Sequence, residues 1–453
     1  MDNGSFWFDS LEQVTTSRAN ALPTDVDVAI IGAGYTGLWT AFYLHKASPE
    51  LSIAVFEANA IGFGASGRNG GWCMGTAMGI DQLLAQPSTQ SAGLQLAQAM
   101  QATVDEIGEV CRTEGINCDF HKGGTLTVAT SAFQAENLQA AVEAAPSLGF
   151  RPDDFQWLSP AEARQRINTA QNHGAIFTPH CAAIHPARLV HGLADKLLGQ
   201  GVQILEQTPV LAYQPGQLET ARGKVRARII LRATEGYTPT LRGHARSLLP
   251  LYSMMIATEP LAPALWEEIG LGDRETFGDT RRIVIYGQRT ADNRLAFGGR
   301  AGYYFGSRIR SVIDPADPHF AKVESALKTL LPQLEQVKIT HRWGGCMGVP
   351  RHWRPFVTFD ARTGLGAAGG YTGEGVAATN LAARILTRLV RGEVHPLTGL
   401  AWIDDVPPNW EPEPLRYLGV SAIEFFGDRA DSAEFASGRP SRFWGGLFSK
   451  FVG

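Results

Sequence analysis

Residues 27–57 contain two short apolar runs separated by a longer amphipathic stretch. The first run, Val-Ala-Ile-Ile at residues 28–31, is too short for a helix and rich in β-branched side chains, which predicts a buried parallel strand. Residues 38–46 have the pattern of a helix, and residues 52–56 predict a second strand. Together they predict a βαβ unit.

A glycine motif, Gly32-Ala33-Gly34-Tyr35-Thr36-Gly37, joins the first strand to the helix. This spacing allows a tight turn, close approach of a pyrophosphate and close packing of helix on strand. Glu57 follows 20 residues after Gly37, at the end of the second strand, where a carboxylate accepts hydrogen bonds from a ribose. The segment predicts a site for an adenine dinucleotide. The alternative is a structural crossover in which Glu57 is a solvated charge.

A second glycine-rich stretch, residues 62–72, directly follows this unit. Its five glycines are interspersed with Ser66, Arg68 and Asn69, so we expect an irregular loop whose N–H groups approach a polar ligand. The loop follows a parallel strand and is therefore expected at the carboxyl end of the sheet, where ligands bind.

The remaining pattern alternates between helices and strands. It predicts helices over residues 92–114, 133–145, 186–199 and 376–390, and strands over 120–130, 202–206, 249–258 and 283–298. Residues 341–360, rich in Gly, Pro and Trp, predict a loop. The aromatic residues 6–8 predict an arm over the core, with a disordered tail as the alternative.

Composition excludes several classes of protein. The net charge of -4 argues against a nucleic-acid partner. The five cysteines lack CxxC spacing, which favours reduced thiols and a cytoplasmic protein over disulfides or zinc. No cluster of ligating side chains predicts a metal site, and neither a signal peptide nor a membrane span is expected.

The two glycine stretches and Glu57 resemble the D-amino-acid oxidase superfamily of FAD-dependent amine oxidoreductases. Two further segments carry the resemblance, Arg228 to Tyr237 and Gly364 to Val376. The first is similar to a family strand that ends in Ala-Thr-x-Gly, and the second to the closing flavin loop. Glu235 departs from the pattern, since Asn or a small residue is expected there, and a carboxylate near pyrophosphate is expected to point to solvent.

The resemblance implies an α/β fold with two parts. An FAD-binding Rossmann-like domain, three-layered with a mostly parallel sheet, would comprise residues 1–90, 170–246 and 341–400. A discontinuous substrate domain on an antiparallel sheet would comprise residues 91–169 and 247–340, followed by a C-terminal wrap or oligomer contact at 401–453.

The resemblance also implies which residues contact FAD. They are Gly32, Ala33, Gly34, Thr36, Gly37, Glu57, Ala58, Gly64, Ala65, Ser66, Arg68, Asn69, Gly70, Gly71, Val210, Ala233, Thr234, Gly370, Thr372, Gly373, Gly375 and Val376. Non-covalent FAD is favoured. A covalent link at Cys346 is the alternative, because sarcosine oxidase carries its flavin on a Cys-Met in this region.

Candidates for the substrate pocket are fewer. Arg300 ends a strand after two glycines, and a guanidinium pairs bidentately with an anionic tail; a surface ion pair is the alternative. Trp72, His121 and Tyr252 are further candidates by topology, with core or surface roles as alternatives. No catalytic acid or base is identified.

These features predict FAD-dependent oxidation of a small primary or secondary amine or amino acid. Hydride would pass to flavin N5, the imine would hydrolyse, and O2 would accept the electrons to give H2O2. One alternative is an amine dehydrogenase that passes electrons to a quinone or carrier protein. Another is a flavin-holding subunit of a multiprotein complex. The sequence leaves the particular amine, the stereochemistry and the oligomeric state open.

Overall fold

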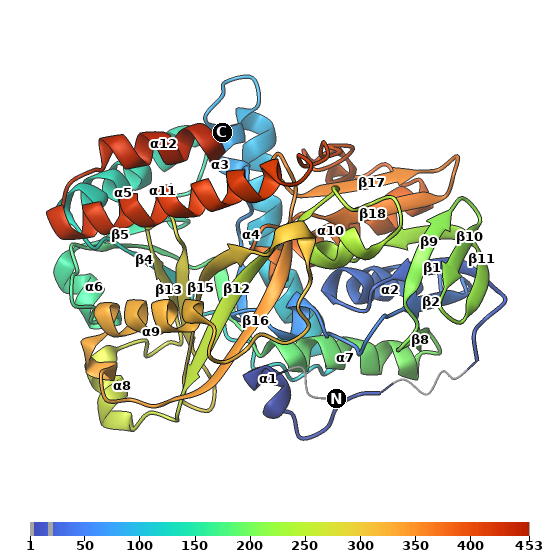
Figure 1. Ribbon diagram of the computed structural model, residues 1–453, viewed down its shortest axis with the longest axis horizontal. Helices are drawn as coiled ribbons and strands as arrows, with labels where there is room; N and C mark the ends of the chain where they lie inside the picture. Colours follow the sequence, from blue (N-terminus) through green and yellow to red (C-terminus); the bar gives the residue numbers. More distant parts are fainter. Residues whose placement is uncertain (1–3, 17–20, 453) are drawn as a thin grey trace.

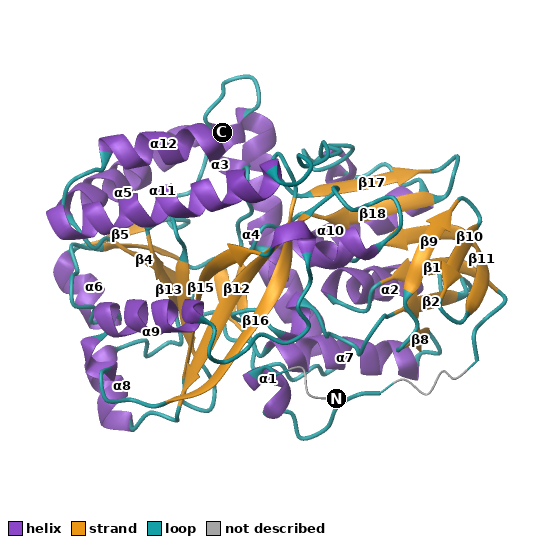
Figure 2. Ribbon diagram, viewed as in Figure 1, coloured by secondary structure: helices purple, strands orange, loops and turns teal. Residues whose placement is uncertain are grey.

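The computed structural model describes residues 4–16 and 21–452. Two sheets lie side by side, with helices packed on both (Figures 1 and 2). The first sheet has the order β17 (Phe356–Asp360), β18 (Leu365–Gly369), β11 (Gly223–Arg232), β1 (Asp25–Ile31), β2 (Ile53–Phe56), β8 (Gln203–Leu205). All pairs from β18 to β8 are parallel, and only β17 runs antiparallel at this edge.

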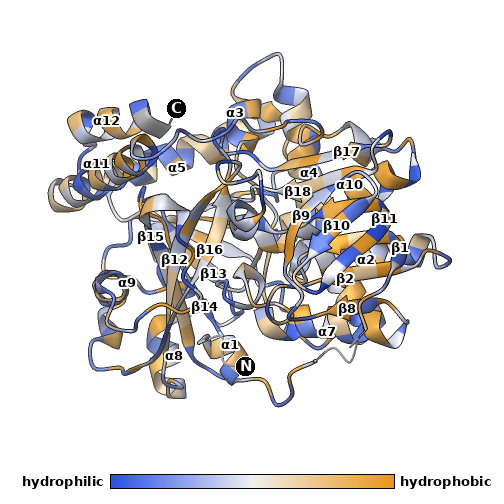
Figure 3. Cartoon of the chain, turned by 45° about the vertical axis from the view of Figure 1, so that its right-hand side comes forward, coloured by the Kyte–Doolittle hydropathy of each residue, from blue (hydrophilic) through white to orange (hydrophobic). Residues whose placement is uncertain are grey.

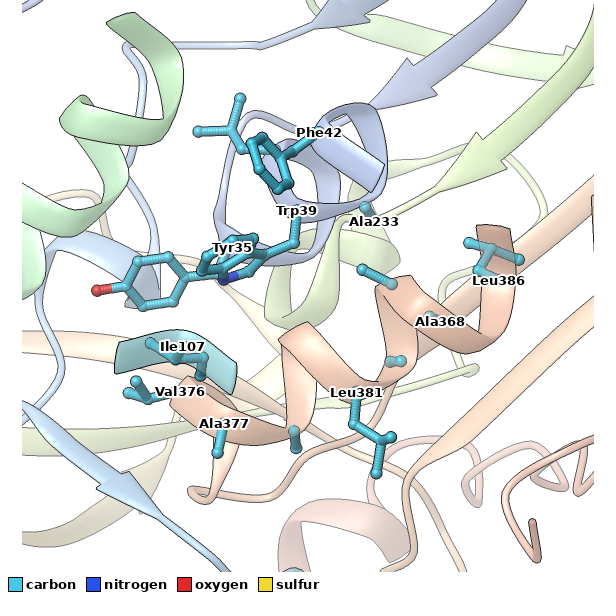
Figure 4. Close-up of a cluster of buried hydrophobic side chains, with 14 of the residues drawn as sticks. Tyr35, Trp39, Phe42, Ile107, Ala233, Ala368, Val376, Ala377, Leu381 and Leu386 are labelled. Carbon is cyan, nitrogen blue, oxygen red and sulfur yellow. The ribbon is translucent and has the colours of Figure 1, made fainter. Parts of the chain in front are cut away.

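The first sheet is the middle of three layers. One face carries the helices α2 (Tyr35–Ala47), α4 (Gln90–Glu114), α7 (Pro186–Gly199) and α10 (Gly375–Arg391). Figure 4 shows side chains of α2, α4 and α10 meeting in this layer, among them Trp39, Ile107 and Leu381. The other face packs against β9 (Val210–Gln214) and β10 (Gln217–Thr220), which pair in series with the start of β11. The predicted three-layer, mostly parallel domain is confirmed.

The second sheet is almost entirely antiparallel. Its order is β16 (Ile339–Val349), β12 (Leu249–Thr258), β15 (Leu295–Tyr303), β14 (Ile285–Arg289), β13 (Thr276–Asp279), β4 (Thr125–Val128), β6 (Ala175–Thr178), β5 (Gln156–Leu158). Only β13 and β4 pair in parallel. The strand β12 is largely apolar (Figure 3), because α9 (Pro318–Leu330) covers one of its faces and the first domain approaches the other.

The shorter elements connect and cover these sheets. They are α1 (Phe6–Asp9), β3 (Trp72–Met74), α3 (Ile80–Leu84), α5 (Ala132–Ala144), α6 (Pro160–Arg166), β7 (Cys181–Ala183), α8 (Pro263–Ile269), α11 (Leu415–Ser437) and α12 (Arg442–Val452). The last two form a helical hairpin above the second sheet (Figure 1). Among residues 4–16 and 21–452, no helix is both long and apolar enough to cross a membrane.

The N-terminal aromatic residues are buried. Phe6, Trp7 and Phe8 pack with Met255 and Trp343 of the second sheet, and the Trp7 indole N–H donates to the carbonyl of Asn69 at 2.7 Å. The predicted arm over the core is therefore confirmed for the residues around α1. This N-terminal arm also contacts one side of the glycine loop at residues 62–72.

The predicted loop at residues 341–360 is wrong for most of its length. Residues up to Val349 belong to β16, and β17 begins at Phe356. The glycines serve close approach in a strand: a Cβ on Gly344 would lie 2.7 Å from the sulfur of Met254, and one on Gly345 would lie 3.1 Å from Cβ of Arg68. The sequence does not show which glycines face a neighbouring strand.

The predicted domain limits remain a prediction, and two elements lie across them. The buried side chains of α4 pack with α2 and α10, although its residues fall in the predicted substrate segment. The strand β16 pairs with β12 of the second sheet, although most of it falls in the predicted FAD segment. Both elements connect the two halves of the molecule.

Candidate functional site

The turn between β1 and α2 has the geometry that its glycines predict. Gly32 has φ +108°, a conformation that L side chains rarely adopt. A Cβ on Gly37 would lie 1.9 Å from the carbonyl oxygen of Gly32, so helix and turn touch at this point. The first N–H groups of a helix have no partner within the helix, so the N-terminus of α2 suits a phosphate.

Glu57 closes the other side of this turn. Its two carboxylate oxygens accept hydrogen bonds from the N–H groups of Ala33 and Asn59, both at 2.8 Å. Burial is the main influence on its pKa and raises it. The alternative of a solvated strand-end charge does not hold, since the carboxylate is part of the turn that a dinucleotide would contact.

The glycine loop at residues 62–72 lies against the N-terminus of α2. The Ser66 hydroxyl accepts a hydrogen bond from the Tyr35 N–H at 2.9 Å. Arg68 is only 2% exposed and lies over the Phe63 ring. Its Nε and Nη2 have no hydrogen-bond partner among the described residues. A buried guanidinium with unused donors is costly, which is expected where a polar ligand completes a site.

The loop at residues 369–375 reaches the same place from the end of the chain. The hydroxyl of Tyr371 lies 3.1 Å from the hydroxyl of Thr36 on α2, so segments more than 300 residues apart meet here. Glu374 precedes α10 without a capping hydrogen bond from its side chain. The N-terminus of α10 therefore points at this junction with its positive dipole end.

Glu235 has a structural role that its sequence position did not predict. Its carboxylate does not point to solvent but accepts hydrogen bonds from the N–H groups of Gly348 at 2.6 Å and Tyr371 at 2.9 Å. It thereby ties the end of β16 to the loop at residues 369–375. Burial is the largest influence on its pKa and raises it to about 7.

Replacing Glu235 by Gln is expected to change how stability depends on pH. The folded protein binds a proton at Glu235 more tightly than the unfolded chain, whose pKa is near 4.5. The free energy of unfolding should therefore fall as pH rises from 4.5 to 7 and stay level above 7. Between these limits the wild type should lose about 2 to 3 kcal/mol relative to Glu235→Gln.

Urea unfolding of both proteins at saturating FAD, repeated across pH 4.5 to 8, measures this difference. Glu219→Gln is the matched control, because Glu219 forms an exposed ion pair with Arg242. Its curve should run parallel to that of the wild type. Parallel curves for Glu235→Gln as well would contradict the buried, proton-binding carboxyl.

The predicted FAD contacts gather at the carboxyl ends of the parallel strands. The turn at Gly32 to Gly37, the loop that begins at Gly64 and the loop at Gly370 to Val376 meet there with Ala233 and Thr234, which follow β11. Val210, at the start of β9 and 8% exposed, follows Thr208, whose N–H donates to the carbonyl oxygen of Glu57 at 2.8 Å. The unpaired Arg68 and the two open helix N-termini fit FAD, which would supply a hydride acceptor at this junction.

Arg300 lies at the edge of this junction, on β15 of the second sheet. Its Nη2 donates to the carbonyl oxygen of Thr372 at 3.2 Å. Burial is the main influence on the pKa of Arg300 and lowers it, while the nearby Glu374 opposes the shift. No ion pair joins Arg300 to a carboxylate among the described residues, so the predicted alternative of a surface ion pair does not hold.

Three further side chains surround this position. Ser253 faces Arg300 in the pairing of β12 with β15, and its hydroxyl lies 2.6 Å from that of Tyr286. The Tyr286 ring meets the edge of Trp72, with centroids 5.9 Å apart. The Trp72 indole N–H donates to the carbonyl of Gly287. Trp72 and Arg300 thus border one region, whereas sequence reasoning missed Ser253 and Tyr286, whose only signal would have been the strand register.

The other candidates lie elsewhere. Tyr252 is fully buried on the α9 side of β12, and its hydroxyl accepts from the Arg310 N–H at 2.6 Å. Consecutive strand residues point to opposite faces, so it is turned away from the face of Ser253. His121 is 42% exposed and pairs with Asp273 at 2.8 Å. Neither joins the group around Arg300.

Cys346 is buried behind the same junction. It pairs with Tyr252 in the register of β16 with β12. A Cβ on Gly236 would lie 2.9 Å from its sulfur. Burial is the main cause that raises the pKa of its thiol to about 12, which leaves the thiolate scarce at neutral pH.

Comparison with known proteins agrees with this geometry. The sequence model of the DAO family, described as FAD dependent oxidoreductase, matches residues 27–389. Gamma-glutamylputrescine oxidoreductase of Escherichia coli is 32% identical over 84% of this chain and 87% of its own length. Sarcosine oxidase subunit beta of Rhodobacter capsulatus is 22% identical over 73% of this chain and 77% of its own.

A solved structure shows the same fold. Glycine oxidase from Geobacillus kaustophilus superposes with a TM-score of 0.68 at 20% identity, over 82% of this chain and 96% of its own. The family match extends over far more than half of the 453 residues and includes both glycine stretches, Glu57 and Arg300. The chain therefore belongs to the DAO family of FAD-dependent oxidoreductases.

Proposed function

We propose that this enzyme oxidises a small primary or secondary amine or amino acid that carries an anionic group, with O2 as the acceptor and H2O2 as product. The observation that carries the proposal is Arg300, a half-buried guanidinium without an ion-pair partner among the described residues. It lies against the loop at residues 369–375. An anionic substrate group there would satisfy the guanidinium and hold the amine beside the flavin site.

The surroundings of Arg300 support an orienting role. Trp72 and Tyr286 form an aromatic wall, which excludes water around a neutral amine. No His or carboxylate pair with the geometry of a general acid and base is needed, since orientation supplies much of the rate when hydride leaves a positioned carbon. Relatives and structural neighbours named for a putrescine derivative, glycine and sarcosine support an amine as substrate.

Anaerobic mixing of the purified enzyme with a panel of amines tests this proposal. The flavin absorbance near 450 nm should bleach with one class of amines that carry a carboxylate or similar anion, and should return on admission of air with formation of H2O2. Bleaching without return in air would favour the alternative dehydrogenase. Failure of every amine to bleach the flavin would reject the amine as substrate.

A second candidate, a flavin-holding subunit of a complex, is favoured by one surface feature. The hairpin of α11 and α12 exposes Phe425, Phe435 and Phe443 to 48%, 46% and 68%, and relatives are named as beta subunits of sarcosine oxidase. Gel filtration with an activity assay of the isolated chain separates the two candidates. If the isolated chain elutes as one species and is active, its activity does not depend on a partner protein.

We further propose that FAD is held without a covalent bond and that the protein is cytoplasmic. The raised pKa of Cys346 disfavours the reactive thiolate, and all five thiols are free and buried, as suits a reducing compartment. Acid precipitation should leave the yellow colour in the supernatant. A yellow pellet would contradict non-covalent binding, and fractionation that recovers the protein outside the cytoplasm would contradict the location.

A further inference from the structure

A large cavity extends outward from Arg300, between the second sheet and the C-terminal hairpin. Its volume is about 1130 Å³, and it continues from Arg300 and Trp353 to Phe435 and Phe448. Figure 1 shows α11 and α12 crossing above the ends of β4, β13 and β15. The volume exceeds that needed for a small amino acid, so this space suits a substrate with a long tail.

The hairpin that roofs this cavity is firmly attached. Arg282, in the turn between β13 and β14, pairs with Asp431 at 3.1 Å and Glu434 at 2.7 Å. The N–H groups of Arg282 and Ile283 also donate to Asp431. Gly427 lies where a Cβ would be 2.9 Å from Ile283. The hairpin therefore forms one wall of the cavity. It lies beyond residue 389, where the family match ends.

Most charged groups that line the cavity already have partners. Arg281 pairs with Asp279, Lys322 with Asp428, His319 with Asp317, and Arg282 with Asp431 and Glu434. Two charges remain among the described lining residues, namely the cation Arg300 and the anion Glu424. They have opposite signs, and each lacks an ion pair.

Glu424 projects from α11 toward β15. A Cβ on Gly302 would lie 3.2 Å from its Oε1, which is buried and has no hydrogen-bond partner among the described residues. Burial raises the pKa of Glu424. Gly302 and Arg300 are two positions apart on β15, and so about 7 Å apart along the strand. One elongated molecule can therefore reach both charges.

We propose that Glu424 selects substrates with a second cationic group, held in the outer cavity while their anionic group lies at Arg300. This inference rests on the proposed oxidation of an amine and defines its substrate further. The substrate is then an elongated amine that carries an anion near the reacting end and an additional ammonium or guanidinium group beyond it. A half-buried carboxylate with one buried, unpaired oxygen gains from such a partner, because the cation offsets the desolvation of that oxygen.

Replacement of Glu424 by Gln tests this inference with paired substrates. Each amine that bleaches the flavin is compared with an analogue in which hydrogen or a hydroxyl group replaces the second cation, as in lysine with norleucine. Wild type should prefer the cationic member. Glu424→Gln should lower kcat/KM for that member about 10- to 100-fold, and for the neutral analogue less than about twofold.

Glu109→Gln is the matched control, because Glu109 forms an exposed ion pair with Arg112 on α4 and is not among the residues that line the cavity. It should leave both members of each pair unchanged. Equal losses on both members in Glu424→Gln, or a wild-type preference for the neutral analogue, would overturn the role of Glu424 while leaving amine oxidation intact. A flavin that no amine bleaches would overturn the proposed function itself, and this inference with it.

Discussion

The purified variant Gly34→Val is expected to be colourless. In the wild type a Cβ at Gly34 would lie 2.9 Å from the Ser66 hydroxyl, which accepts the hydrogen bond from the Tyr35 N–H. The side chain of valine would fill the approach to the N-terminus of α2, where the pyrophosphate is expected. Loss of two or more charge-assisted contacts there should weaken FAD binding at least about 100-fold.

The flavin content of the variant, measured as the ratio of absorbance at 450 nm to that at 280 nm, gives the result directly. Gly419→Val is the matched control: it lies on α11 with open space around its Cβ position and should purify yellow. If Gly34→Val kept its full yellow colour, the pyrophosphate would not lie at this helix.

Arg300→Ala is expected to raise KM for an amine with an anionic group about 10- to 100-fold, because a charge-assisted pair contributes about 1.5 to 3 kcal/mol. KM for a neutral amine of similar size should change about threefold or less. Steady-state kinetics with the two amines measures the difference, and Arg300→Lys should recover part of the loss, since an ammonium keeps the charge without the planar fork.

Arg362→Ala provides the control for this experiment. Its side chain is 86% exposed and pairs with Asp360 at the far edge of the first sheet, so both KM values should stay at the wild-type level. If Arg300→Ala raised KM equally for both amines, the guanidinium would support the structure of the loop at residues 369–375 and would not bind an anionic group.

The nucleotide-binding half of the fold could be predicted because its signals are local. Strand, turn, helix and Glu57 fall within residues 27–57, and each element is defined by its own side chains. The helix predicted over 376–390 corresponds to α10, Gly375–Arg391. The strand predicted over 249–258 matches β12, Leu249–Thr258.

The substrate half could be predicted less well because its signals are relations between strands. Ser253 faces Arg300 only through the register of β12 with β15, which no local pattern specifies. Topology alone points to Tyr252, whereas its neighbour Ser253 is the residue that pairs with Arg300. The glycines of β16 favour a loop in the sequence pattern. The side chains that leave no room for a Cβ at these positions, such as Met254, are distant in sequence.

Glu235 is another residue whose surroundings could not be predicted from the sequence. A carboxylate in a nucleotide-binding motif predicted exposure, because burial of an unpaired charge is costly. The structure instead provides two backbone N–H groups, from Gly348 and Tyr371, which come from elements more than 100 residues away. The hairpin of α11 and α12 was likewise predicted only as a wrap, since its helices do not show which side chains face the cavity.

An anaerobic single-turnover experiment tests amine oxidation most directly. The enzyme is mixed with one equivalent of each amino acid of the panel or, separately, of the hydroxy acid that differs from it only at the reacting group. The hydroxy acid is the informative competitor, because a 2-hydroxyglutarate dehydrogenase is also among the relatives. One flavin should be bleached and one carbonyl product formed per amine consumed, and the hydroxy acid should cause no bleaching. Bleaching by the hydroxy acid alone would contradict amine oxidation.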